Sequence, residues 1–275
     1  MTQKLAIATF KPPNKSLKPV LKRFPQLQGL VIPAFILVAW ESAAQLGWVA
    51  PNLLPAPSTV LSTIWELASK GELWQHIGIT LYRVFLGFLV GAISATILGG
   101  LTGYSRIVHA FLDPLIQSLR SIPSLAWVPL FILWLGIQET SKVTLVAVGV
   151  FFPIYLSLMS GIRDVDRKLI EVGKIYRLKN WQLIARVFLP ATLPAYVVGI
   201  RSGLGLGWMF VVAAELMGAS QGLGFLLVDG QSTGRPAITI ASILLFAIFG
   251  KLTDSLVVLL SSRFLNWQDS YIAKV

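Results

Sequence analysis

The chain has 275 residues, of which 55% are hydrophobic and 13% charged, and its formal net charge is +11. With a mean hydropathy of +0.73 it lies outside the range of soluble globular domains, which predicts an integral membrane protein. The sequence contains no cysteine, which excludes a disulfide framework and thiolate metal ligands.

The first 26 residues are basic, and we interpret them as a disordered cytoplasmic tail held near a negatively charged leaflet. They contain no acidic residue and six cations: Lys4, Lys11, Lys15, Lys18, Lys22 and Arg23. An apolar segment follows at about 28–47. A cleaved signal peptide is the competing interpretation, but the charged region is long and no small-residue cleavage site follows, so a retained membrane anchor is favoured. The chain therefore divides into a tail, residues 1–26, and a transmembrane domain, residues 27–275.

Residues 48–77 begin with a turn-rich PNLLPAPS stretch and continue as a predicted surface helix with Ser58 as its N-cap. One face of this helix carries Val60, Leu61, Ile64, Trp65 and Ala68. Tryptophan favours the boundary between lipid and water, so the outer membrane interface is its expected place. A short soluble cap is the alternative, and the sequence leaves both open.

Five further apolar segments are each long enough to cross a hydrocarbon core, for which about 20 residues suffice. They lie near 79–103, 111–135, 142–162, 192–217 and 236–262, which predicts an all-α protein with six transmembrane helices. The 111–135 segment is the least regular because Pro123 and Pro129 interrupt it. Broken backbone at membrane depth is tolerated only against protein or a wet cavity.

Small residues recur every four positions in two of these segments. One ridge consists of Gly87, Gly91, Ala95, Gly99 and Gly103, and the other of Gly199, Gly203 and Gly207. Such ridges let helix backbones approach closely where lipid provides no hydrophobic drive for association. Both ridges are therefore predicted to be helix–helix contacts, and general glycine enrichment of membrane helices is the alternative.

Between the fourth and fifth of the six spans lies a basic polar stretch, centred on Leu169–Pro194, that predicts a helix, a tight turn and a second helix. Apolar positions at helical spacing define the two faces: Val165, Leu169, Val172 and Tyr176 in the first helix, and Trp181, Ile184 and Phe188 in the second. Asp164 and Asn180 are the expected N-caps. Pro190 is expected to end the second helix, since proline has no N–H and disfavours helical geometry before it.

Residues 171–194 resemble the cytoplasmic coupling motif of permease subunits in bacterial ABC importers. Glu171, Gly173, Leu189 and Pro190 match that motif, whereas Val172 and Gly173 replace the usual two alanines and Arg177 replaces the usual glycine. If the turn requires a positive φ at this position, Arg177 is strained where glycine would not be. The resemblance implies that the coupling loop, about 163–190, contacts an ATPase through Glu171, Gly173, Lys174, Arg177, Leu189 and Pro190, with Glu171 paired to a basic residue of the ATPase.

The Lys and Arg distribution predicts the orientation in the membrane. With the amino terminus inside, the inner segments hold sixteen of these residues, and the outer loops hold three, Lys70, Lys142 and Arg235. Such an asymmetry places both termini and the coupling loop in the cytoplasm. The net charge therefore reflects topology, and nucleic-acid binding is not expected.

Charged residues inside predicted spans cost about 2.5–3.5 kcal/mol each on insertion scales unless they are paired or wet. They are Glu41, Arg83, Arg120, Arg201, Glu215, Lys251 and Asp254. Lys251 and Asp254, three residues apart, are predicted to pair with each other, and Arg83 is expected to be an interface anchor. Arg120 could meet inner headgroups or face the translocation path. Together with Trp208, the residues Arg201, Arg120 and Glu215 form the candidate path, Arg201 being the best placed.

Catalytic motifs are absent from the sequence. His76 and His109 stand alone, and Gly250-Lys251 lacks the neighbours of a phosphate-binding loop. The chain is therefore predicted not to be an enzyme and to bind neither a cofactor nor a metal. Any ATP chemistry belongs to another chain.

A wider resemblance, over about residues 30–270, is to the permease subunits for aliphatic sulfonates, taurine and nitrate. It rests on TLYRVFLGF (80–88), LRSIPSLAWVPLFILWLGI (119–137), FFPIYLSLMSGIRDVD (151–166), GIRSGLGLGWMFVVAAELMGASQGLGFLLVDGQ (199–231) and GKLTDSLVVLLSSRFLNW (250–267). The 208–231 and 250–267 segments favour the sulfonate branch.

This resemblance implies a type I ABC importer in a bacterial inner membrane. Its expected parts are two permease copies, a homodimer or a heterodimer, two ATPase subunits that bind ATP and Mg²⁺, and an external solute-binding protein. Import would proceed by alternating access. An ATP-independent channel or secondary carrier is the alternative from another class, although no repeat relates the two halves of the chain. A membrane-embedded enzyme is a third and more remote alternative.

Overall fold

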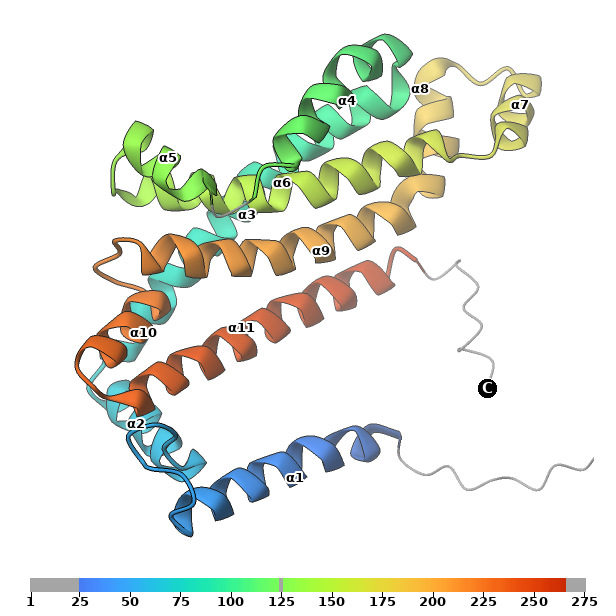
Figure 1. Ribbon diagram of the computed structural model, residues 1–275. Coiled ribbons are helices and arrows are strands. Elements are labelled where there is room, and N and C mark those ends of the chain that lie inside the picture. The colour runs from blue at the N-terminus through green and yellow to red at the C-terminus, as the bar shows by residue number, and fades with distance from the viewer. Residues whose placement is uncertain (1–24, 124–125, 266–275) are drawn as a thin grey trace, which may run out of the picture.

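The computed structural model describes residues 25–123 and 126–265, and the regular secondary structure of this part of the chain consists only of helices (Figure 1). The predicted tail therefore lies almost wholly outside the described residues. The helices are α1 Pro25–Gln45, α2 Pro57–Ser69, α3 Glu72–Tyr104, α4 Arg106–Arg120, α5 Trp127–Leu135, α6 Glu139–Arg163, α7 Arg167–Ile175, α8 Asn180–Leu183, the π-helical segment η2 Ile184–Phe188, α9 Leu189–Leu216, α10 Leu223–Ser232 and α11 Pro236–Ser262.

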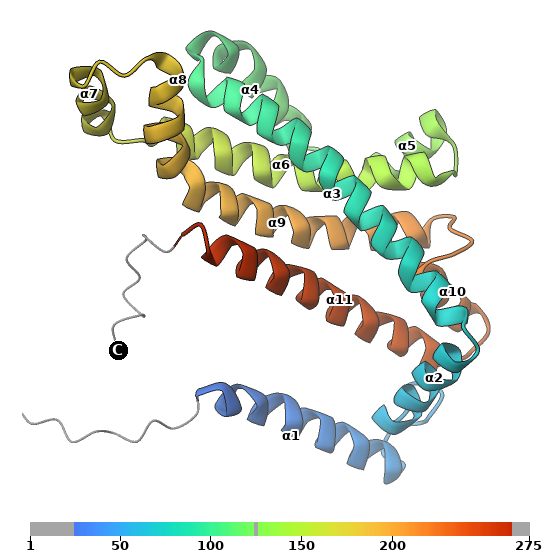
Figure 2. The same ribbon diagram turned by 180° about the vertical axis from the view of Figure 1, so that it is seen from behind.

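Within the described residues, four helices are long and apolar enough to cross a membrane. They are α3, α6, α11 and the continuous helix from Asn180 to Leu216 that joins α8, η2 and α9. Helices α6, α9 and α11 lie side by side, and α3 crosses them on the far side (Figures 1 and 2). These helices contain the predicted spans at 79–103, 142–162, 192–217 and 236–262, which makes this a multi-pass membrane protein.

The predicted span at 111–135 is interrupted at Pro123, as expected, but not at Pro129. It is divided between α4, of 15 residues, and α5, of 9 residues. The break contains Pro123, which supplies no N–H and disfavours helical geometry in the residue before it. The other proline of this segment, Pro129, lies in the first turn of α5, where a missing N–H costs little.

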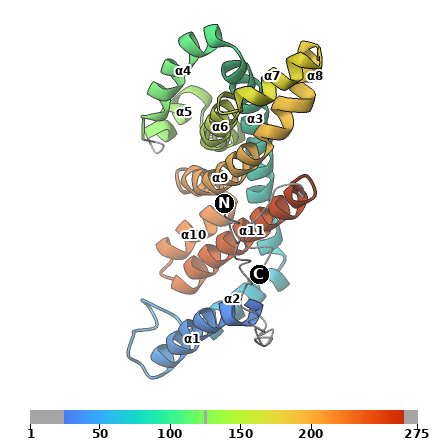
Figure 3. The ribbon, with the colours of Figure 1, turned by 90° about the vertical axis from the view of Figure 1, so that its right-hand side faces the viewer.

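The first predicted span corresponds to α1, whose clearly apolar part is Val31–Gln45. This helix lies apart from α11 and reaches the rest of the molecule through α2 (Figures 1 and 3). Its apolar side chains, among them Ile32 and Phe35, are exposed in the single chain. Consequently α1 contacts the rest of the fold mainly at the end that adjoins α2.

Helix α2 begins one residue after Ala56, so Ser58 is not its N-cap as expected. The Ser58 N–H and hydroxyl instead donate to the Glu41 carboxylate of α1, at 3.0 and 2.7 Å. A carboxylate from the neighbouring helix thus performs the capping role. The predicted apolar face is divided, because Val60 is buried while Leu61 and Trp65 are exposed.

Both glycine ridges are confirmed as close helix contacts, and both pack against α6. A Cβ atom at Gly87 would lie 2.6 Å from the Cβ of Val146, and one at Gly99 would lie 3.0 Å from the Tyr155 carbonyl oxygen. On α9, a Cβ at Gly199 would lie 2.6 Å from the Cβ of Ser157. Because no side chain separates these backbones, α3, α6 and α9 form one tightly packed unit.

The expected caps of the coupling loop are displaced by one or two residues. Helix α7 is capped by Asp166, whose carboxylate accepts from the Lys168 N–H at 2.9 Å, while Asp164 ends α6. Helix α8 begins after Lys179, whose N–H donates to the Gln182 side-chain oxygen at 2.9 Å. Asn180 is therefore the first residue of α8, not its cap.

Pro190 does not end the second helix, which also corrects the expectation. The preceding five residues form the π-helical segment η2, and the Leu189 N–H bonds to the Ile184 carbonyl five residues back. The wider π turn accommodates a residue that cannot donate a hydrogen bond. The coupling loop therefore continues into α9 without a break.

Candidate functional site

Helices α7 and α8 lie at one end of the bundle, and α2, α5 and α10 lie at the opposite end (Figure 1). A hollow of about 630 Å³ is formed between α7, the turn, η2 and the start of α9. Leu169, Val172, Gly173 and Pro190 are among the residues that line it. Glu171 and Lys174 are exposed and form no ion pair within the described residues. Their charges are free to meet a partner.

The turn after α7 contains Arg177 at φ 52°, the one positive φ outside glycine among the described residues. The Arg177 N–H bonds to the Lys174 carbonyl at 2.9 Å, and the Leu178 N–H bonds to the Gly173 carbonyl at 3.1 Å. This pair of bonds is a Schellman motif, which requires a left-handed residue where Arg177 stands. The condition stated from the sequence is therefore met, and Arg177 adopts the positive φ that glycine would adopt without strain.

Gly173 is buried at the centre of the coupling loop. A Cβ atom at this position would lie 2.5 Å from the Leu183 Cδ1 atom, so the alanine usual in the motif would clash unless Leu183 moved. The glycine therefore lets α7 and α8 pack more closely than alanine would. The departure from the motif at Gly173 is explained by this contact.

Large apolar side chains project from this polar end of the molecule. Ile175 and Tyr176 are each 77% exposed, and Trp181 is 64% exposed. Such a patch, rimmed by basic residues, is typical of a surface that another protein covers. The coupling loop therefore presents both apolar and charged groups to a partner.

At the opposite end, Arg83 is buried, so its expected role as an interface anchor is wrong. Its side chain is 1% exposed and forms two hydrogen bonds of 2.6 Å with Glu139 of α6. It also donates to Glu215 of α9 at 2.8 Å and to the Gln221 carbonyl at 2.7 Å. One guanidinium thereby joins three membrane helices and the loop after α9.

The loop between α9 and α10 is fixed by the same cluster. Glu215 accepts from the Thr80 hydroxyl at 2.8 Å and from the Gly224 N–H at 2.7 Å. The Gly222 N–H donates to Nδ1 of His76 at 3.0 Å. His76, expected to be isolated, therefore anchors this loop. Gly222 adopts φ 122°, and a Cβ there would lie 2.6 Å from the Glu215 carboxyl group.

Arg201 and Trp208, two candidates for the translocation path, both have partners on α11. The Arg201 guanidinium binds both carboxylate oxygens of Asp254, at 2.8 and 3.1 Å. The predicted Lys251–Asp254 pair also forms, at a longer 3.8 Å. The Trp208 N–H donates to the Thr253 hydroxyl at 2.9 Å, and its ring is buried in the core. These contacts attach α11 to α9.

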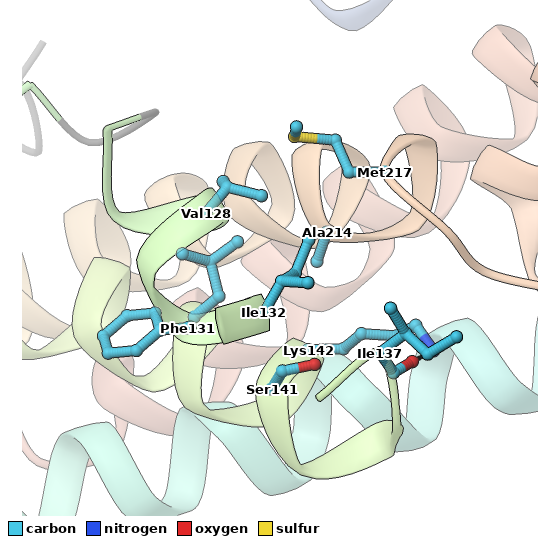
Figure 4. Close-up of a pocket in the computed structure, with 9 residues that line it drawn as sticks. Val128, Phe131, Ile132, Ile137, Ser141, Lys142, Ala214 and Met217 are labelled. Atoms are coloured by element: carbon cyan, nitrogen blue, oxygen red, sulfur yellow. Dashed lines mark hydrogen bonds between the residues drawn. The ribbon is translucent and has the colours of Figure 1, made fainter. Parts of the chain in front are cut away.

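Arg120, the remaining candidate, ends α4 where the backbone breaks. It lines a cavity of about 360 Å³, together with the break itself, Trp127 of α5 and residues of α6 and α9. A second hollow lies between α5, α6 and α9 and includes Val128, Lys142 and Ala214 (Figure 4). Its volume of about 10 Å³ holds at most about one water molecule. Only the first of the two could hold a solute.

No group of three or more His, Asp or Glu side chains in the described residues could hold a metal ion. Several ionisable groups within the bundle form ion pairs between helices instead, namely Arg83 with Glu139 and Glu215, and Arg201 with Asp254. Sequence reasoning missed the Arg83–Glu139 and Arg201–Asp254 pairs because the partners are 56 and 53 residues apart. No local spacing signal could have revealed them.

Comparison with known proteins identifies the same kind of protein in each case, a membrane component of a transport system. A family model described as "Binding-protein-dependent transport system inner membrane component" matches residues 87–266. The chain is 45% identical over 254 residues to the "Putative aliphatic sulfonates transport permease protein SsuC" of Bacillus subtilis (strain 168), with 92% of each chain covered. It is 33% identical over 239 residues to the "Taurine transport system permease protein TauC" of Escherichia coli (strain K12), with 85% of this chain and 87% of the relative covered.

Among solved structures, the fold is similar to that of a chain of the inward-facing MetNI methionine ABC transporter. The TM-score is 0.56 at 19% sequence identity, and the match covers 74% of this chain and 98% of the other. At this level of identity the likeness concerns the fold alone. It identifies the helical arrangement as that of a type I importer permease.

Proposed function

The chain belongs to the family of binding-protein-dependent transport system inner membrane components, and from this membership we propose that it imports an aliphatic sulfonate. In this proposal the chain is the transmembrane permease subunit, and ATP with Mg²⁺ is bound and hydrolysed by a separate subunit. The coupling loop is the observation that carries the proposal, because a channel or secondary carrier has no use for a surface that receives force from an ATPase.

The substrate class is supported by similarity. Sulfonate permeases are the relatives at 45% and 39% identity, whereas the taurine permease is at 33%. Taurine is itself an aminosulfonate, so the compounds named for both groups of relatives contain the same acidic group, a sulfonate. Nitrate is the second choice, since it shares the negative charge but not the alkyl chain.

The coupling loop gives the ATPase a mechanical connection to the membrane helices. The ATPase would cover the apolar patch of Ile175, Tyr176 and Trp181, with Glu171 paired to one of its basic residues. Because Asn180–Leu216 is one continuous helix, a displacement of the turn passes directly to α9. Leu189 and Pro190 lie within this helix and transmit the movement.

Close packing determines which helices move together. The glycine contacts bind α3, α6 and α9 into one unit, which would rotate as a body when the two ATPases close. Helix α1 lies apart from this unit and α11 is attached through the Arg201 and Trp208 contacts. Two orientations of the unit, each stabilised by different contacts, amount to alternating access.

The proposed assembly contains two copies of this chain, two ATPase subunits on the cytoplasmic side and a solute-binding protein outside. Both termini and the coupling loop face the cytoplasm, as the distribution of Lys and Arg supports. The end formed by α2, α5 and α10 faces outward and receives the binding protein. The solute crosses between the two copies.

The proposed coupling role is tested with Glu171→Ala in proteoliposomes that contain the ATPase and the binding protein. We expect ethanesulfonate uptake and substrate-stimulated ATP hydrolysis to fall about tenfold, the effect of losing one hydrogen bond to a charged group. The amount of protein in the membrane should not change. Glu171→Asp is the matched control, because it keeps a carboxylate at the same position and should retain part of the coupling.

Unchanged coupling in Glu171→Ala would contradict the role of this residue. Uptake of ethanesulfonate in the absence of ATP would identify a carrier or channel instead. Parallel uptake of taurine and nitrate measures the substrate choice, and we expect ethanesulfonate to be preferred.

A further inference from the structure

We propose that Arg120 binds the acidic group of the transported anion in the cavity beside the α4–α5 break. The proposal rests on the proposed import function and adds a binding site inside the permease. Three observations carry it: the depth of the cavity, the lack of a counterion for Arg120, and the chemistry of the cavity walls.

The cavity lies well inside the membrane region of the bundle. Its walls include Gly149, Phe152 and Pro153, near the middle of the 25-residue helix α6, and Leu206 of α9. At such depth, non-helical backbone is tolerated only against protein or a water-filled cavity. The non-helical residues Ser121–Pro123, which line the cavity, therefore mark a place where the permease admits water or solute.

Arg120 carries an uncompensated positive charge at this depth. Among the described residues its one polar contact is with the Gln117 side-chain oxygen, at 3.5 Å, and no carboxylate pairs with it. Arg83 and Arg201, the other arginines within the spans, are both bound by carboxylates. An unpaired charge at membrane depth faces a water-filled cavity and marks an ion or substrate pathway.

The same comparison separates Arg120 from Arg201, the residue that sequence analysis placed first in the path. Asp254 binds the Arg201 guanidinium through both oxygens and also pairs with Lys251, so the Arg201 N–H donors that face α11 are already occupied. Arg120 retains its full charge and its free N–H donors. Of these two arginines, Arg120 is therefore the one that we expect to attract an anion.

The cavity walls suit an anion that also has an alkyl part. Around Arg120 stand Trp127, Phe152, Leu156 and Phe210, all apolar or aromatic. The planar guanidinium presents paired N–H donors that match a tetrahedral or planar oxyanion. A volume of about 360 Å³ lies within the roughly 300–1,000 Å³ range of small-molecule sites. Together these features fit a short alkanesulfonate better than a bare inorganic ion.

The first experiment measures ethanesulfonate uptake by the complete reconstituted importer. We expect Arg120→Gln to reduce uptake about tenfold or more, the loss for one charged hydrogen-bonding partner, and Arg120→Lys to retain part of it. Arg106→Gln is the matched control, because Arg106 lies at the other end of the same helix, away from the cavity. Wild-type uptake in Arg120→Gln would overturn the proposal.

The second experiment uses the absence of cysteine from the chain, which makes an introduced thiol unique. In Ser121→Cys, which places the thiol in the wall of the same cavity and keeps Arg120, ethanesulfonate should slow the reaction of the thiol with methanethiosulfonate reagents, whereas its neutral analogue ethanesulfonamide should not. Adding Arg120→Gln to this variant should abolish the protection. In Arg120→Cys, uptake should be low before modification of the thiol. Attachment of an aminoethyl group, which restores a positive charge, should recover uptake. Attachment of a sulfonatoethyl group should not.

Protection of the thiol by ethanesulfonate requires binding of the anion but not its transport. This measurement therefore tests the Arg120 site separately from the proposed import function. If the wild-type importer takes up none of the anions while ethanesulfonate still protects the thiol, the proposed function fails and the Arg120 site stands. If ethanesulfonate leaves the labelling rate unchanged, the site is wrong whatever the importer carries.

Discussion

Arg177 occupies a backbone conformation that the chemistry of its side chain does not favour. A left-handed φ places the Cβ atom of an L-residue against its own backbone, at a cost of about 1–2 kcal/mol. Glycine would avoid this cost, and the two Schellman hydrogen bonds leave no other conformation at this position. Backbone strain of this kind clusters at functional sites, so we expect the Arg177 side chain to contact a partner in the assembly.

Arg177→Gly should therefore stabilise the turn by about 1 kcal/mol, because glycine adopts positive φ freely. The Leu178 N–H bond should then open less often, and its hydrogen exchange should slow roughly fivefold. The measurement is amide exchange over residues 173–178 in detergent solution.

Lys174→Gly is the control for Arg177→Gly, since it also removes a cation near the end of α7 but places glycine in a helical position. There the substitution should cost about 1 kcal/mol, and exchange should become faster. Equal effects of the two variants would show that charge, and not backbone conformation, governs the turn.

The burial of Arg83 could not be predicted from its position in the sequence. Near the end of an apolar segment, an arginine that meets headgroups and one that is fully buried have the same sequence signature. The difference depends on Glu139 and Glu215, which lie 56 and 132 positions away. Removing one partner of such a buried cluster leaves a charge uncompensated, which makes these residues the least replaceable ionisable groups at this end of the molecule.

At the scale of helices, the four-residue glycine spacing was the most informative pattern in the sequence. It predicted contacts that the structure places on α6 from both sides, with α3 on one side and α9 on the other. Helices that touch through backbone atoms leave no room for even one methyl group. The register of α3 against α6 is fixed by this constraint.

Gly91→Ala should destabilise the protein by about 1–3 kcal/mol, since the added Cβ would lie 2.9 Å from the Val150 Cβ and against the α6 backbone. Gly100→Ala adds the same methyl group to the same helix, where nothing lies within 4 Å. It should be neutral or stabilising by up to about 1 kcal/mol.

Thermal unfolding in detergent measures the difference between Gly91→Ala and Gly100→Ala, at about 2–4 °C per kcal/mol. Opposite signs are expected for the two variants. A similar change of Tm in both would mean that the α3–α6 contact is not the close one described above.

Prolines acted on helices in a context-dependent way. Pro123 lies in the break between α4 and α5, whereas Pro190 lies inside a continuous helix whose preceding π turn accepts the missing donor. The sequence shows the missing N–H in both places, but not how the neighbouring backbone adapts. This adaptation decides whether the coupling loop moves α9 directly.

For the whole molecule, the distribution of Lys and Arg predicts the orientation in the membrane. Lys and Arg gather at the end formed by the coupling loop, and the opposite end holds few of them. With a cysteine-free chain, single introduced thiols report this orientation. In Lys174→Cys and Lys179→Cys, membrane-impermeant maleimide should label the thiol only after the cytoplasmic face is opened.

Lys70→Cys provides the matched measurement for the other face, because Lys70 follows α2 at the opposite end of the molecule. In intact right-side-out vesicles or spheroplasts, this thiol should be labelled at once. Labelling of Lys174→Cys from outside would invert the topology and remove the proposed contact with an ATPase.

By itself, the sequence determined the membrane class, the approximate positions of the long helices, the glycine contacts and the family motif with its strained Arg177. These features are encoded in composition, in short-range periodicity and in residues that restrict their own backbone. Only the tertiary structure decided which proline divides the third span, the continuity through Pro190 and the partners of each buried charge. The physical reason is that a charge is neutralised by whatever lies nearest in space. Arg201 forms an ion pair with a carboxylate of α11, whereas Arg120 lines a cavity and has no carboxylate partner among the described residues.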